Sequence, residues 1–169
     1  MAQTPESDPA CDVAHGTAEG GAAERTLVAV FASPVAAYLL RYGHDLGFST
    51  VLVEPDPERA RTAGAVTSVP ELDETADIVV TDHHREELGE VLRDALAQPA
   101  RWIGVLGNPR HEGPHVAALE ALGVPAADIA RVHRPVGLNI GSRTPAEIAI
   151  ATLAGLLADR NGRPGGFEF

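Results

Sequence analysis

Residues 26–55, TLVAVFASPVAAYLLRYGHDLGFSTVLVEP, contain two short apolar runs separated by a segment with helical spacing. The runs TLVAVFA and STVLVEP have the length and composition of buried strands. The segment between them opens with Pro34 and ends near Gly47, residues typical of the start and the end of a helix. A strand, a helix and a second strand in this order predict a βαβ unit with parallel strands.

The same alternation continues along the rest of the chain. Strands are predicted at DIVVTDHH (residues 77–84) and RWIGVLG (101–107), with a short further strand near residues 66–69. Helices are predicted after residue 56, at 85–98 and 109–123, in one turn at 125–130, and from Thr144 onward. Together these elements predict an α/β, Rossmann-like three-layer fold: a mostly parallel sheet with helices on both faces.

Composition divides the chain into one domain with two tails. Residues 1–24 are small, polar and acidic and predict a disordered acidic tail, in which Cys11 is an incidental thiol. Residues 25–163 form the predicted single Rossmann-like domain, and residues 164–169 a frayed C-terminal tail.

Charge and residue usage exclude several classes of protein. The net charge is −11, which argues against binding to nucleic acid or to an anionic membrane. All 13 basic residues are arginine, so no lysine is present for a Schiff base or a phosphate-binding loop. A single cysteine allows no intrachain disulfide and no multi-cysteine metal site. With no secretory signal and no membrane-length apolar run, a cytoplasmic location is expected.

The first strand-to-helix turn departs from the dinucleotide-binding pattern. In that pattern, GxGxxG or GxGxxA, the glycines let a pyrophosphate approach the backbone. Here Phe31 and Ser33 occupy the first two glycine positions, and only the small third position, Ala36, is kept. Glu54 lies 23 residues after Phe31, where a ribose-binding carboxylate is expected, although an exposed strand-end acid is the favoured interpretation. NAD(P) binding involving Ser33 and Glu54 is therefore disfavoured but stays an alternative.

Thr144-Pro145-Ala146-Glu147 has the form of a capping box at the start of a long apolar helix. Upstream, two glycines, Ser142 and Arg143 place a hydroxyl and a cation beside that helix N-terminus, which is the chemistry of an anion site. The alternative is that the glycines only form a turn and that Arg143 pairs with a neighbouring carboxylate.

Polar loops follow three other predicted strands, and parallel strands end at one edge of the sheet. We expect these loops to form one cleft in which Arg110 and Arg143 face an anionic ligand, most simply phosphate. The alternative is that both arginines pair with surface acids. The predicted cleft residues are Asp82, Gly104, Gly107, Asn108, Arg110, Gly137, Asn139, Gly141, Ser142, Arg143 and Thr144.

No metal site or catalytic motif is predicted. Because adjacent strand residues point to opposite faces, His83 and His84 are not expected to share one ion. The other histidines lack a metal-binding spacing, and no nucleophile elbow or catalytic triad is evident. The sequence therefore favours a non-catalytic protein over an enzyme.

Residues 98–163 resemble the C-terminal Rossmann domain of the XdhC/CoxI family. The block GLNIGSRTPAEIA, residues 137–149, corresponds to the family pattern GLxIGxRTPxEIA, and residues 30–55 resemble the family more weakly. The resemblance implies an accessory protein, or chaperone, for maturation of a molybdenum hydroxylase such as xanthine or CO dehydrogenase. It implies binding of the molybdenum cofactor (molybdopterin) or of the apo-enzyme, with Gly104, Gly107, Gly137, Gly141, Arg143 and Thr144 forming the cleft.

The chain departs from the family pattern in three places. It has no counterpart of the N-terminal domain with its cysteine, it lacks the first-turn glycines, and residues 107–111 have lost basic side chains. The expected partners are therefore the molybdenum hydroxylase apo-enzyme, a separate chain supplying the missing domain, and a second copy in a homodimer. The alternatives are a nucleotide-binding oxidoreductase and a degenerate Rossmann domain kept for protein association.

Overall fold

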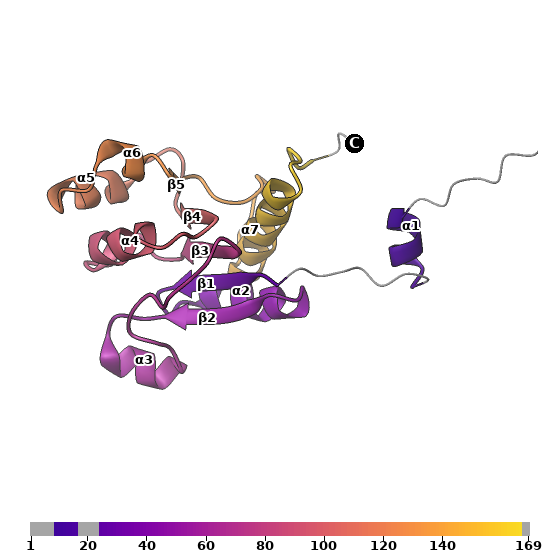
Figure 1. Cartoon of the computed structure of the whole chain (residues 1–169), viewed down its shortest axis with the longest axis horizontal. Coiled ribbons are helices and arrows are strands. Elements are labelled where there is room, and N and C mark those ends of the chain that lie inside the picture. The colour runs from indigo at the N-terminus through magenta and orange to yellow at the C-terminus, as the bar shows by residue number, and fades with distance from the viewer. Residues whose placement is uncertain (1–8, 17–23, 167–169) are drawn as a thin grey trace, which may run out of the picture.

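The computed structural model describes residues 9–16 and 24–166 (Figure 1). Its strands are β1 (Thr26–Val30), β2 (Ser49–Val53), β3 (Ala76–Val80), β4 (Trp102–Val105) and β5 (Val132–His133). Its helices are α1 (Pro9–Ala14), α2 (Pro34–Asp45), α3 (Pro57–Ala63), α4 (Leu88–Leu96), α5 (Pro114–Ala121), α6 (Ala126–Ile129) and α7 (Pro145–Arg160). Within the described residues, no helix is long and apolar enough to cross a bilayer.

All five strands are parallel and lie in the order β2-β1-β3-β4-β5. A single parallel bridge between Val53 and Val66 extends the sheet beyond β2. Counting that bridge as a strand gives the strand order of the doubly wound dinucleotide-binding fold. The structure thus confirms the predicted α/β fold, and the short strand predicted near residues 66–69 is reduced to one bridge.

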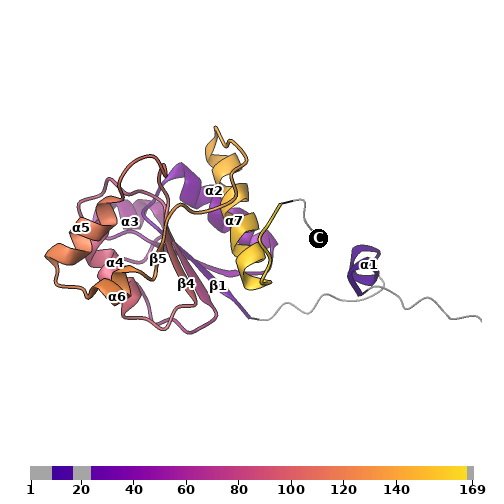
Figure 2. The same cartoon turned by 90° about the horizontal axis from the view of Figure 1, so that it is seen from above.

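Helices cover both faces of the sheet (Figure 2). Alternate residues of β1 point to opposite faces: Leu27 and Ala29 pack with α2 and α7, whereas Val28 and Val30 pack with α4, α5 and α6. Every residue of β3 is buried, as expected for a central strand of a parallel sheet. Two apolar clusters, one on each face, therefore fix the sheet between its helical layers.

A buried ionic cluster closes the amino edge of the sheet. The Asp77 carboxylate is fully buried and accepts from Arg101 Nε at 2.7 Å and from Arg160 Nε at 2.8 Å. Arg160 also donates to the Thr75 carbonyl, and its guanidinium lies over the Phe48 ring. Because Arg160 is the last residue of α7, this cluster ties the end of that helix to β3.

The structure adds two elements that the sequence does not predict. Pro9–Ala14 forms α1, within residues predicted to be a disordered tail; the rest of that segment lies mostly outside the described residues. The two-residue strand β5 is too short to produce a hydrophobic pattern, so residues 132–133 read as loop. The helix predicted at 109–123 begins only at Pro114, because residues 109–110 form a turn and residues 111–113 are not helical.

Candidate functional site

The turn after β1 is filled by its own side chains. Phe31 adopts a left-handed backbone, with φ of 72°, at the position of the first glycine of the nucleotide-binding pattern. Its ring is fully buried and lies under the Arg85 guanidinium, 4.7 Å from the ring centroid. Ser33 caps α2 by accepting from the Ala36 amide, and its hydroxyl also bonds Thr81. The groups that would meet a pyrophosphate therefore already have partners within the chain.

Glu54 is enclosed in the same network. Its side chain is fully buried and accepts from the Ala32 amide at 2.9 Å and from the Asp56 amide at 3.2 Å. Arg85 donates to both carboxylate oxygens, at 3.0 and 2.9 Å. The expectation of an exposed acid at this strand end is wrong, since Arg85 reaches across from the β3–α4 loop and covers it.

The electrostatics of Glu54 favour its charged form. Burial raises the pKa of the Glu54 carboxyl, but hydrogen bonds from Arg85 and from two backbone amides outweigh burial and leave the pKa below its ordinary value. The hydrogen bonds between Arg85 and Glu54 raise the pKa of Arg85, which also donates to Glu87 at 2.9 Å. The positive charge of Arg85 is thus balanced by two carboxylates.

The segment that carries the family-like block packs directly on α7. A Cβ added at Gly137 would lie 2.9 Å from the Ala151 carbonyl carbon, and Gly137 has φ of 86°. The next residue, Leu138, donates its amide to the Ala151 carbonyl at 3.0 Å. A Cβ at Gly155 would lie 3.0 Å from the Gly137 Cα atom. The close approach of two backbones and the positive φ therefore require glycine at Gly137, and a side chain at Gly155 would push the two segments apart.

The structure confirms the capping box at the start of α7. Thr144 Oγ1 accepts from the Glu147 amide, and Glu147 accepts from the Thr144 amide. The same Glu147 oxygen also accepts from the Arg143 amide at 2.5 Å. The chain's own carboxylate thus occupies the anion position at this helix N-terminus, while the Arg143 side chain is exposed without an ion-pair partner among the described residues.

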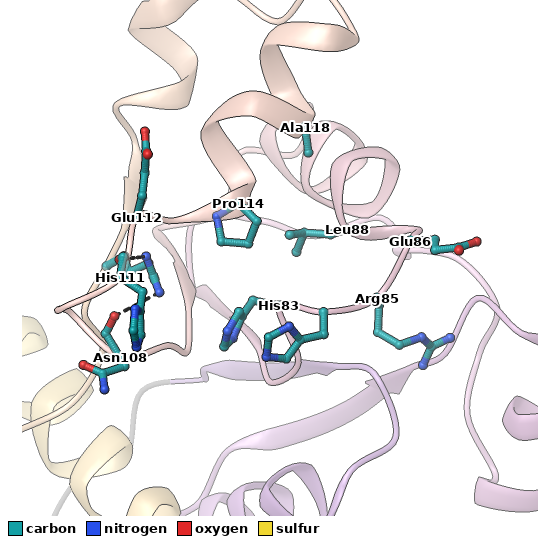
Figure 3. A pocket seen from close by; sticks show the side chains of 11 residues that line it. His83, Arg85, Glu86, Leu88, Asn108, His111, Glu112, Pro114 and Ala118 are labelled. Atoms are coloured by element: carbon teal, nitrogen blue, oxygen red, sulfur yellow. Dashed lines mark hydrogen bonds between the residues drawn. The ribbon is translucent and has the colours of Figure 1, made fainter.

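A pocket of about 780 Å³ opens between the β3–α4 loop and the β4–α5 loop, at the carboxyl edge of the sheet (Figure 3). Figure 3 shows Leu88, Pro114 and Ala118 along one side of it, and His83 and Arg85 along the other. The complete lining is His83, His84, Arg85, Glu86, Leu88, Asn108, His111, Glu112, Pro114, Ala118 and Arg134. The pocket therefore combines a small apolar wall with imidazole and guanidinium donors and two carboxylates.

Arg134, which follows β5, holds one wall of this pocket in place. Its guanidinium donates to the His111 carbonyl at 2.9 Å and to the Asn108 carbonyl at 3.1 Å. A Cβ at Gly107 would lie 2.5 Å from Arg134 Nη2, and one at Gly113 would lie 2.8 Å from Nη1. A side chain at either position would therefore displace the Arg134 guanidinium from its place on this wall. Among the described residues Arg134 has no carboxylate partner, and its buried Nε has no hydrogen-bond partner.

His83 and His84 both line the pocket, with ring centroids 4.1 Å apart. The prediction that they point to opposite faces is wrong, because β3 ends at Val80 and residues 81–84 no longer alternate. Burial, His84 and Arg134 lower the pKa of His83. No group of three or more metal-ligating side chains is found in the described part of the chain.

The structure separates the predicted cleft residues into three groups. Asn108 lines the pocket, and Gly107 packs under the Arg134 guanidinium of its wall. Gly104 lies against the Trp102 ring within the core, and Asp82 accepts from the His84 amide within its own loop. The third group, outside the pocket lining, is Arg110, Gly137, Asn139, Gly141, Ser142, Arg143 and Thr144. Whether any of these residues binds a ligand stays a prediction.

Sequence reasoning missed three of the side chains that define the pocket. Arg85 and His111 lie in loops directly after predicted strands, so their position along the chain was an available signal. Arg134 gave no such signal, because β5 is only two residues long.

The fold and the site define a Rossmann-like α/β domain with a filled first turn and an open pocket over its later strands. The XdhC Rossmann domain matches residues 27–156, and the chain therefore belongs to this family. It is 44% identical over 77 residues to a protein of Escherichia coli strain K12 described as uncharacterized protein YqeB.

A solved structure shows the same fold. The crystal structure described as a xanthine dehydrogenase from Bacillus halodurans matches with a TM-score of 0.63 and 22% identity, covering 82% of this chain. The chain spans only part of each relative: 14% of the Escherichia coli protein and 45% of the Bacillus halodurans chain.

Proposed function

We propose that this protein is an accessory protein for the maturation of a molybdenum hydroxylase, and that it handles the molybdenum cofactor at the carboxyl edge of its sheet. The observation that carries the proposal is the match of the XdhC Rossmann domain to residues 27–156. The pocket between α4 and α5 supports it, because ligands of open α/β sheets bind at this edge.

The donors in the pocket fit a cofactor that carries a pterin and a phosphate. His84 and His111 offer ring N–H groups, and Arg134 offers a cation without a carboxylate partner in the described chain. Leu88 and Pro114 add an apolar surface against which a flat ring can pack. When bound, the cofactor supplies molybdenum redox chemistry to its client enzyme, while this chain binds and orients it.

The residues do not fit NAD(P) at the usual place. Phe31 fills the turn that the pyrophosphate occupies in dinucleotide-binding domains. Glu54 already accepts from Arg85 and two amides, so a ribose hydroxyl would have to displace one of them. A hollow of about 500 Å³ remains between α2, β2 and α3, beside Ser33. For this reason the nucleotide alternative is tested in parallel.

The test is calorimetry on the purified chain with molybdenum cofactor, NAD, NADP and ATP, followed by reconstitution of a molybdenum hydroxylase apo-enzyme. We expect saturable binding of the cofactor, no binding of the nucleotides, and faster activation of the apo-enzyme when the cofactor is delivered by this protein. Nucleotide binding without cofactor binding would replace the proposal with the nucleotide-binding alternative. Association with the apo-enzyme without cofactor binding would restrict the role to protein association.

A further inference from the structure

The pocket between α4 and α5 has an unbalanced positive side. Arg85 lines it but is already paired with Glu54 and Glu87. Arg134 lines it too, yet bonds only backbone carbonyls, and its Nε has no partner. Glu86 and Glu112 also line the pocket, but neither forms an ion pair with Arg134.

The helices that border the pocket are capped differently from the other long helices. Among the described helices of eight or more residues, α2 is capped by Ser33 and α7 by Thr144. The amides of α4 and α5 receive no side-chain cap. Their first residues, Leu88 and Pro114, both line the pocket, so two helices without a side-chain cap begin beside it; the Leu88 amide donates to the Arg85 carbonyl, and Pro114 has no amide hydrogen. Each presents the positive end of a helix dipole.

Imidazole side chains complete the lining of the pocket. Burial, His84 and Arg134 lower the pKa of His83, whereas its hydrogen bond to the Leu106 backbone acts in the opposite direction. His84 and His111 are exposed at the rim. His115, in the first turn of α5, is 7% exposed, and its Nδ1 has no hydrogen-bond partner. Burial and Arg134 lower the pKa of His115.

We propose that this pocket is a binding site for a tetrahedral phosphate-type oxyanion, held by Arg134 and by the ring N–H groups of His84 and His111. The oxyanion is either free or the phosphate end of a larger ligand. This inference deepens the proposed function. It depends on that function only in taking the phosphate group to be part of the molybdenum cofactor. It moves the predicted anion site from Arg110 and Arg143 to the residues around Arg134.

The experiment measures binding of inorganic phosphate to the full chain by calorimetry at constant ionic strength. The test variant is His84→Ala/His111→Ala, because both side chains are exposed and neither donates a structural hydrogen bond in the described chain. The control is Arg41→Ala, which removes an exposed cation from α2 on the opposite face of the sheet. We expect saturable phosphate binding that is at least tenfold weaker in the double variant and unchanged in the control.

Two further variants report on charge. Glu112→Gln removes a pocket carboxylate and should strengthen phosphate binding several-fold. Arg134→Ala should abolish binding; since Arg134 also supports the β4–α5 loop, its melting temperature is measured alongside. Absence of saturable binding, or equal losses in the double variant and in Arg41→Ala, would overturn the inference.

Competition with the molybdenum cofactor separates the two proposals. Cofactor binding that phosphate competes away, and that weakens in the double variant, supports both. Cofactor binding unaffected by phosphate and by His84→Ala/His111→Ala refutes the oxyanion site and leaves the proposed function intact. Saturable phosphate binding without cofactor binding keeps the oxyanion site and refutes cofactor handling.

Discussion

Removing Arg85 should expose how strongly the buried Glu54 carboxylate depends on its partner. In Arg85→Met the carboxylate keeps the amides of Ala32 and Asp56 and the half-exposed Arg59 guanidinium at 3.7 Å, but loses two charge-assisted bonds at 3.0 and 2.9 Å. Glu54 is 0% exposed, so water cannot replace those bonds without local opening. Breaking a buried ion pair by removing one partner costs about 3–5 kcal/mol. At about 2–4 °C per kcal/mol, the melting temperature should fall by roughly 10 °C.

A double-mutant cycle measures the pair itself. Glu54→Gln keeps the shape and removes the charge, and the double variant removes both partners. The double variant should be about 2 kcal/mol more stable than the sum of the single losses predicts, within the range for residues in one network. Urea denaturation of all four proteins at pH 7 gives the coupling. Additivity within about 0.5 kcal/mol would show that Arg85 does not stabilise the ionised Glu54, and would refute the reasoning.

Three further predictions concern separate parts of the fold. Gly137→Ala should lower the free energy of unfolding by more than about 2 kcal/mol, because the added Cβ would lie 2.9 Å from the α7 backbone. Gly141 also has a positive φ but has no atom within 4 Å of an added Cβ, so Gly141→Ala is the matched control for backbone strain. Thr144→Ala should cost about 1 kcal/mol in urea denaturation by removing the cap of α7, whereas Thr144→Ser should cost less. The pKa of His115 is lowered in the folded protein, so at a pH below the unfolded pKa of about 6.5 the unfolded chain binds a proton that the folded chain does not. Stability should therefore fall as pH decreases from 7 to 5, and His115→Gln should reduce that slope.

The architecture was predictable because it follows from local patterns. The apolar runs at β1, β2, β3 and β4 and the proline-led helices specify parallel strands without any knowledge of contacts. The capping box at Thr144 and Glu147 was predictable for the same reason, since both partners lie within one turn. A short strand was predicted near residues 66–69, whereas the structure has one bridge at Val66. A single bridge leaves almost no pattern in the sequence, so its extent could not be predicted.

The site was much less predictable, because it depends on contacts between residues far apart in the chain. Glu54 and Arg85 are 31 residues apart, and nothing in either segment shows that they meet. Arg134 reaches back to Asn108 across 26 residues from a strand too short to detect. The sequence motif after Pro135 suggested a ligand loop, whereas Gly137 in this motif is explained by packing on α7. A motif defines which residues recur, but the packing decides which of them face solvent.

The filled turn after β1 has a consequence for how such a domain can change over time. Replacing Phe31 by glycine would not reopen a pyrophosphate site, because Ser33 would still cap α2 and Arg85 would still cover Glu54. The same change would empty the space of a fully buried ring and leave Arg85 without the surface on which it stacks. This single step toward a nucleotide-binding turn would therefore lower stability without restoring affinity. A pyrophosphate site at this turn is not within reach of one substitution, which leaves the rest of the sheet edge as the place for a ligand.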